Sequence, residues 1–304
     1  MSRRLLAALS LASLLGGAAT PALADPQPSA LPGQAGGDPA PDTKAAQDLL
    51  IRGRYEEAIA ATKRALQRDE RYVPAMIVMA KAYYALRKYE LATSIIDISK
   101  GIDPNNAEAL NLLGFIGIAQ NNKISATAAF KQAVQAKPDY GNAWNNLCAQ
   151  YLESKNYDGA VEAAEKATQL LPTFPKAWMN LGSAYRGKGR YVDAETAYRK
   201  ALAYNPGYAE VYFNLGILFL DAPQWPNIDI QAKLNFAIAN LTKYREMMAS
   251  RLTKDDPAEG YMEEARKAIE REKKRLERAA KQKERDKAKQ PAAPPPAATP
   301  APDA

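Results

Sequence analysis

The sequence has 304 residues, of which 47% are hydrophobic and 25% are charged, which suits one or two globular domains. It contains no histidine and one cysteine, Cys148, so it lacks the commonest general base and metal ligand, and we expect no catalytic residues, no metal site and no cofactor. The net charge of +7 equals the excess of twelve Lys and Arg over five Asp and Glu between residues 266 and 289, so the remainder is near neutral and nucleic acid is not an expected partner.

Residues 1–24 have the pattern of a secretory signal peptide. Arg3 and Arg4 supply a positive start, an apolar run follows, and Ala22-Leu23-Ala24 has the form of a cleavage site. The run is too short for an ordinary membrane helix, although an uncleaved anchor is the alternative. We therefore expect export to the periplasm and a mature chain that begins at Asp25.

Residues 25–41 are rich in Pro, Gly and Ala and have almost no large apolar side chains, which predicts a disordered linker. From Asp42 onward apolar residues recur with helical spacing, and the whole pattern repeats every 34 residues.

Five series of residues recur at this interval. Three series contain small residues, the fourth contains prolines and the fifth contains large side chains. They are Ala58, Ala92, Ala126, Ala160 and Ala194; Ala65, Ser99, Ala133, Ala167 and Ala201; Gly114, Cys148, Gly182 and Gly216; Pro104, Pro138, Pro172 and Pro206; and Met76, Leu110, Trp144, Trp178 and Tyr212. Small residues let two helices approach closely, large residues fill the space between neighbouring pairs, and each proline ends a helix. Each unit is thus a helix–turn–helix that must stack on its neighbours to bury a core.

The pattern resembles the tetratricopeptide-repeat (TPR) family. The run from Ala177 to Tyr185, AWMNLGSAY, followed by Tyr191, Ala194, Tyr198, Ala201 and Pro206, is similar to a consensus repeat. The resemblance implies an all-α, right-handed solenoid over residues 42–250, with about six repeats at 42–72, 73–106, 107–140, 141–174, 175–208 and 209–250. The sixth contains an insertion near 221–230, after which its second helix is expected over 228–248. In 107–140, Gly117 and Lys123 replace larger residues and predict thinner packing.

Residues 255–290 form a predicted basic, charged helix with a narrow apolar stripe at Met262, Ala265, Ile269 and Leu276. We expect its first part to cap the solenoid and its distal part to contact an anionic surface peripherally. The alternative for the basic part is a solvated helix held by ion pairs four residues apart. Residues 291–304 form a Pro/Ala tail, for which we expect disorder.

The resemblance also implies that the first helix of each hairpin lines a concave, partner-binding groove. Its candidate residues are Lys81, Tyr84, Asn111, Phe115, Asn145, Asn146, Lys176, Asn180, Arg186, Phe213 and Asn214. The asparagines could hydrogen-bond an extended peptide or, equally, serve helix packing and capping. Asn146 and Lys176 match two positions of the carboxylate clamp of some TPR domains, but the other positions do not. Cys148 and the aromatic columns are expected to be core residues.

These features predict a non-catalytic protein–protein interaction scaffold of the bacterial cell envelope, whose partners are other envelope proteins or peptides. The alternative is a cell-wall- or carbohydrate-binding accessory module that uses exposed aromatic rings. The combined signal, repeats, insertion, basic helix and tail are similar to envelope TPR proteins of the adventurous gliding-motility machinery.

Overall fold

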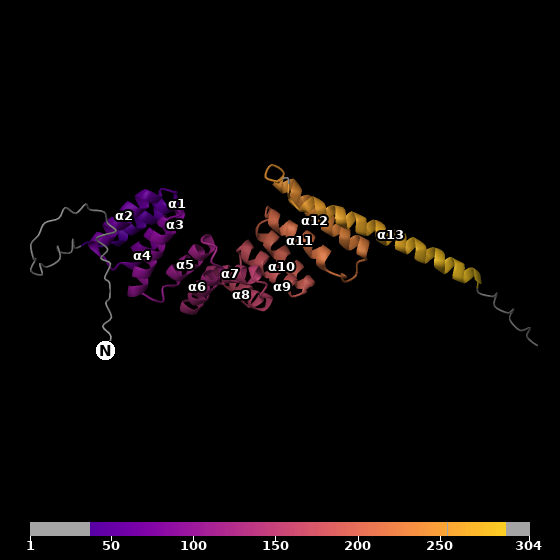
Figure 1. Cartoon of the computed structure of the whole chain (residues 1–304), viewed down its shortest axis with the longest axis horizontal. Coiled ribbons are helices and arrows are strands. Elements are labelled where there is room, and N and C mark those ends of the chain that lie inside the picture. Colours follow the sequence, from indigo (N-terminus) through magenta and orange to yellow (C-terminus); the bar gives the residue numbers. More distant parts are fainter. Residues whose placement is uncertain (1–36, 254, 290–304) are drawn as a thin grey trace, which may run out of the picture. The chain divides into compact units, whose positions relative to one another are not determined.

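A computed structural model describes residues 37–253 and 255–289, which fold into thirteen α-helices with no β-strand beyond one isolated bridge (Figure 1). The all-α prediction is therefore confirmed. The expected signal peptide at 1–24, nearly all of the expected linker and the expected tail at 291–304 lie outside the described residues. The chain divides after Pro172 into two compact units, each of which has its own packed helices.

The first unit contains four helical hairpins. Their helices are α1 (Ala40–Ile51), α2 (Tyr55–Arg68), α3 (Val73–Ala85), α4 (Tyr89–Ile102), α5 (Ala107–Ala119), α6 (Lys123–Ala136), α7 (Gly141–Glu153) and α8 (Tyr157–Leu170). The two helices of each hairpin pack together, and α2, α4 and α6 also pack on the first helix of the next hairpin. The first helices α1, α3 and α5 contact one another in turn, which is the stacking expected of a solenoid.

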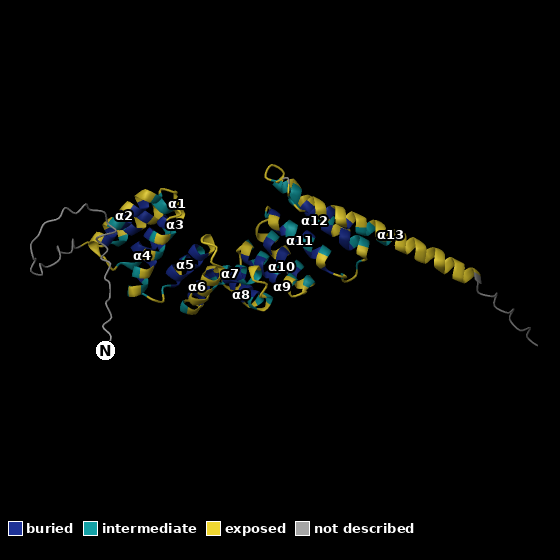
Figure 2. Ribbon diagram, in the orientation of Figure 1, coloured by how far each residue is buried: buried dark blue, intermediate teal, exposed yellow. Residues whose placement is uncertain are grey.

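The second unit contains two hairpins and a long final helix. Its helices are α9 (Pro175–Gly187), α10 (Tyr191–Tyr204), α11 (Ala209–Asp221), α12 (Ile230–Met248) and α13 (Ala258–Lys289). Helix α13 packs along α12 and also touches α11. Ala258, Met262 and Ala265 are buried, Ile269 is half-buried, and Leu276 is 48% exposed. Residues 277–288 are all exposed, as Figure 2 shows along the far part of α13.

In three hairpins a glycine on the first helix faces a large side chain on the second. A methyl group added at Gly114 would lie 2.3 Å from the ring of Phe130, and one at Gly182 would lie 2.6 Å from the ring of Tyr198. These distances leave no room for any side chain at the glycines. Glycine is therefore required at these positions because the facing side chains on the second helix are large.

The expectation of thinner packing in residues 107–140 is wrong. A methyl group at Gly117 would lie 2.8 Å from the backbone nitrogen of Ala126, so the missing side chain brings the backbones of α5 and α6 together. The pair is closely packed where the sequence suggested a gap. Glycine here replaces side-chain contact by backbone contact.

The turns within the first five hairpins share one backbone device. Gly53, Arg87, Asn121, Lys155 and Gly189 all have positive φ, between 57° and 74°, and they follow one another at 34-residue intervals. The left-handed conformation lets the chain reverse after the first helix. Two of the five positions, Arg87 and Lys155, carry side chains that normally avoid this region.

The sixth hairpin contains the expected insertion. Its length follows from the number of residues between facing positions on the two helices. Gly216 meets Leu241, 25 residues later, whereas Phe130 and Tyr198 lie 16 residues after their glycines, so the loop adds nine residues. Helix α12 begins at Ile230, two residues later than expected, because the Asp229 side chain accepts a hydrogen bond from the Ala232 N–H at 2.7 Å.

The first described helix also differs from expectation. Helix α1 begins at Ala40, inside the predicted linker 25–41. Pro41 is tolerated in the first turn because the N–H that it lacks has no intrahelical partner there. The Asp38 side chain accepts the Ala40 N–H at 2.8 Å and satisfies another free donor.

Candidate functional site

The first helices of the first unit present a half-exposed apolar surface, the unit 1 face, made of Tyr84, Phe115, Ile118 and Leu152. The rings of Tyr84 on α3 and Phe115 on α5 lie 6.4 Å apart, and Ile118 is 44% exposed. Tyr84, Ile118 and Leu152 occupy the same position in successive repeats. The predicted groove residues Tyr84 and Phe115 are therefore brought together, on a surface that can bury apolar side chains of a partner.

Lys81, the charged candidate of this unit, forms an ion pair with Glu108 across α3 and α5. Both side chains are more than a third exposed, so the pair contributes little to stability. An anionic group on a partner could compete with Glu108 for the lysine.

The asparagines of the first unit serve helix packing. The Asn146 side-chain amide donates to the Asn111 side-chain oxygen at 2.9 Å, joining α7 to α5. Asn111 is only 7% exposed, and Asn145 is also buried. A buried amide needs a partner inside the protein, so the packing interpretation of Asn111 and Asn146 fits the structure better than peptide binding.

The candidates of the second unit lie in different environments. Lys176 at the start of α9 is exposed, Asn214 is half-buried and Asn180 is buried. Phe213 packs against Tyr244 of α12 and Tyr261 of α13, with ring centroids 5.1 and 6.1 Å away. Phe213 is thus held by the final helix rather than presented to a ligand, and these candidates do not form one surface.

Arg186 is part of a polar cluster between α9, α10 and α11. Its guanidinium pairs with Asp221 at 3.0 Å, and the Tyr198 hydroxyl lies 3.1 Å from the Ser183 hydroxyl. Burial raises the pKa of Tyr198 above its ordinary value, with Ser183 and Arg186 opposing the shift. The phenol therefore stays neutral at physiological pH, and Arg186 is engaged within the protein.

The aromatic columns are used structurally. The Trp144 indole donates to the carbonyl oxygen of Pro138 at 2.9 Å, which fastens α7 to the preceding turn. Lys200 lies over the Trp178 ring, 4.3 Å from its centroid.

Cys148 lies buried in α7. Burial raises the pKa of its thiol to about 12, so the reactive thiolate is absent near neutral pH. The described parts of the chain contain no group of His, Cys, Asp and Glu side chains arranged to hold a metal ion.

No helix among residues 37–253 and 255–289 is both long and apolar enough to cross a membrane.

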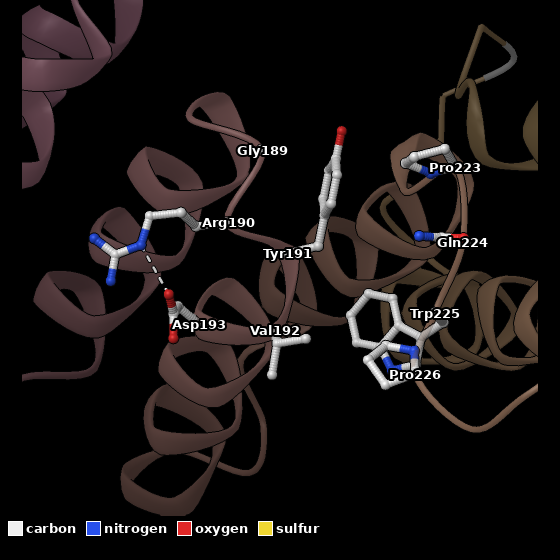
Figure 3. Close-up of a pocket in the computed structure, with 9 residues that line it drawn as sticks. All are labelled: Gly189, Arg190, Tyr191, Val192, Asp193, Pro223, Gln224, Trp225 and Pro226. Carbon is white, nitrogen blue, oxygen red and sulfur yellow. Dashed lines mark hydrogen bonds and ion pairs between the residues drawn. The ribbon is translucent and has the colours of Figure 1, made fainter.

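Sequence reasoning missed a pocket beside the insertion. A cavity of about 670 Å³ lies between the start of α10 and the loop that follows α11. In Figure 3, Tyr191 and Val192 on α10 face the loop that carries Pro223, Gln224 and Trp225. The ion pair of Arg190 and Asp193, 2.7 Å long, lies on the side of the pocket away from that loop. An isolated Trp between two prolines in an insertion was the available signal.

Comparison with known proteins identifies the repeats. Models of the tetratricopeptide repeat match residues 49–116, 107–140 and 175–208. No curated protein matches the chain.

Three solved structures are similar in fold. PilF of Pseudomonas aeruginosa has a TM-score of 0.58 and 19% identity, covering 70% of this chain and 98% of its own. PilW, described as a widely conserved type IV pilus biogenesis factor, has a TM-score of 0.58 and 19% identity, covering 73% and 97%. YrrB, described as a TPR protein with an unusual peptide-binding site, has a TM-score of 0.52 and 17% identity, covering 63% and 94%. The helical hairpins at residues 49–140 and 175–208 therefore match the tetratricopeptide repeat.

Proposed function

We propose that the chain is a non-catalytic scaffold that binds partner proteins or peptides in the bacterial cell envelope. The observation that carries the proposal is the unit 1 face, where Tyr84, Phe115, Ile118 and Leu152 of successive first helices are left partly exposed. TPR domains generally mediate protein–protein interactions, and an apolar surface flanked by the Lys81–Glu108 pair suits a protein ligand. YrrB is described as having a peptide-binding site, which supports the same general role.

The envelope location rests on the sequence of the first 24 residues, with its two arginines, apolar run and Ala22-Leu23-Ala24. The pilus biogenesis role described for PilW is in keeping with such a location but belongs to that protein. Sequencing the amino terminus of protein from the envelope fraction should give Asp25 first. A chain that starts at Met1 would contradict the export proposal.

Site-specific photocrosslinking tests the scaffold proposal. A photoreactive residue at Ile118, on the unit 1 face, should trap a discrete partner in intact cells. The same residue at Ile124, 85% exposed at the start of α6, is the matched control and should trap much less. Equal yields of the same products from both sites would contradict specific binding. Leu152→Asp should abolish the Ile118 crosslink because it places a charge on the face.

The resemblance to envelope proteins of the gliding-motility machinery finds no support among the compared proteins, so the proposal names no pathway. The alternative, a cell-wall- or carbohydrate-binding module, needs aromatic rings that are open to a ligand. Tyr191 and Trp225, which line the pocket in Figure 3, are the rings that favour it. Binding of soluble glycan fragments that Trp225→Ala removes would favour this alternative over the scaffold.

A further inference from the structure

The pocket beside Trp225 is chemically suited to a proline-rich segment. Its lining combines two aromatic rings, Tyr191 and Trp225, with the rings of Pro223 and Pro226 and with Val192, which is 50% exposed. A polyproline II segment buries its flat rings against such surfaces and leaves its backbone carbonyls free. The indole, the Tyr191 hydroxyl and the exposed Gln224 amide are the donors that could reach those carbonyls.

The pocket is held in shape by the rest of the sixth hairpin. The Trp225 ring packs on Phe219 with a centroid distance of 4.6 Å, and Phe219 stacks on Phe236 at 5.5 Å. The loop is fixed by the bridge between Trp225 and Ile228 and by the buried ammonium of Lys233, which donates to the Ala222 carbonyl. A preformed surface binds an extended segment at a lower cost in conformational entropy.

A second cavity, of about 700 Å³, links the pocket to the final helix. Pro223, Gln224 and Trp225 line both cavities, and Glu272, Arg275 and Leu276 of α13 line the second. Helix α13 therefore passes the insertion at Leu276 and then continues to Lys289. The helix therefore connects the second cavity to the segment 290–304.

We propose that this pocket binds a proline-rich segment and that its occupant is the chain's own residues 290–304. That segment contains six prolines and six alanines among fifteen residues. From Leu276 to Lys289 the helix rises about 20 Å, at about 1.5 Å per residue. Twelve residues, as many as 291–302, would span about 37 Å in polyproline II form, at about 3.1 Å per residue, so the segment is long enough to return to Leu276, beside the loop of Pro223, Gln224 and Trp225.

This occupancy goes beyond the scaffold function, because it makes the insertion a docking site distinct from the unit 1 face. A proline-rich partner would have to displace the chain's own segment before it could bind there. The second unit would then admit only ligands that bind more tightly than an intramolecular competitor.

A labelled peptide of residues 290–304 tests the pocket by fluorescence anisotropy. It should bind the chain that ends at Lys289, and it should bind the full-length chain at least tenfold more weakly because the attached segment competes. A peptide with all six prolines replaced by alanine should not bind. Equal affinity for the two chains, or for the two peptides, would overturn the proposal.

Paired variants locate the binding site. Val192→Asp should weaken peptide binding to the chain that ends at Lys289 by more than tenfold. Ile124→Asp, at the same repeat position in the α5–α6 hairpin and also exposed, should change it by less than twofold. Equal loss in both variants, or none in Val192→Asp, would place the peptide elsewhere. Neither outcome bears on the crosslink at Ile118, so the two proposals fail separately.

A measurement in the full-length chain avoids truncation. With Trp144 and Trp178 changed to Phe, Trp225 is the sole tryptophan. Replacing Pro300 and Pro302 by alanine should then increase acrylamide quenching of Trp225 at least twofold. Unchanged quenching would contradict occupancy by this segment. Protection of Trp225 from acrylamide by added glycan fragments, with no effect of the proline changes, would favour a carbohydrate ligand instead.

Discussion

In several hairpins the sizes of two facing residues, one on each helix, are complementary. Where α5 and α9 carry glycine, the facing residues are Phe130 and Tyr198, and the same 16-residue offset pairs Cys148 with Ala164. Small and large thus alternate across the pair so that the two helices stay at a similar separation. Cys148 is explained by this matching, since its facing residue is small, and no reactive role is needed.

Replacing Gly182 by Ala should lower the free energy of unfolding by about 1–3 kcal/mol, because the new methyl group overlaps the Tyr198 ring. Urea denaturation monitored by circular dichroism measures this loss. The double variant Gly182→Ala with Tyr198→Ala should lose at least about 1 kcal/mol less than the sum of the single losses. Strict additivity would show that the two residues do not share a packing site.

Cys148→Ala should change the pH dependence of stability. The folded pKa of this thiol is raised, so its stabilising contribution is complete below the ordinary thiol pKa and is lost as pH rises towards about 12. Between pH 8 and pH 10 the parent chain should therefore lose about 1.5–2 kcal/mol more than the alanine variant. Urea midpoints at the two pH values test this, and parallel losses would mean that the thiol ionises equally when folded and unfolded.

At the scale of the elements, the hairpins differ in the residue that makes their turn. Gly53 and Gly189 accept positive φ readily, whereas Arg87 and Lys155 do not. The backbone angle φ is therefore similar in all five turns, although the residue at the position differs.

The change Lys155→Gly should raise the melting temperature of the chain, with a gain of about 0.5–1 kcal/mol. Gly189→Ala should lower stability by about 1 kcal/mol, because its φ is 72°. No atom lies within 4 Å of the added methyl group, so a loss would report backbone strain alone. Calorimetry that finds either change neutral would show that the turn shifts to relieve the strain.

The 34-residue period predicted the elements because each column records one packing position. It could not predict the Asn146–Asn111 pair, which joins different columns 35 residues apart. Nor could it predict that Gly117 would close the α5–α6 gap, because glycine permits close approach as readily as it leaves space. The Trp225 pocket lies beside the insertion, which has no counterpart in the other repeats, so the 34-residue period could not place it.

At the scale of the whole molecule, α13 does two different things along its length. Its first turns cover Leu241 on α12 with Ala258 and Met262, as the sequence led us to expect. Residues 277–288 in its distal part are all exposed to solvent. Solenoids need such a terminal helix because the last hairpin otherwise exposes an apolar side.

Ending the chain at Met248 should lower the melting temperature by about 5 °C or more, because Leu241 and Phe213 lose their cover. Ending it at Ala280 should lower the melting temperature less, because the cap stays in place and only the docked segment 290–304 is lost. The same shorter chain should lose salt-sensitive binding to anionic vesicles, if the basic part of α13 contacts such a surface. Identical melting curves for all three chains would contradict a capping role.

The size matching inside each hairpin also constrains how such a chain can have grown. Because Gly114 and Phe130, or Gly182 and Tyr198, belong to one hairpin, a duplication that copies both helices carries a fitted pair with it. A recombination within the turns that made α7 and α6 the first and second helices of one hairpin would instead set Phe130 against Cys148, whose own partner by repeat position is Ala164. We therefore expect rearrangements to be tolerated between hairpins, near prolines such as Pro138 and Pro206, and to destabilise the chain when they fall at the turns within hairpins. The nine-residue insertion before α12 obeys the same rule, since Leu241 still reaches Gly216 after the extra loop.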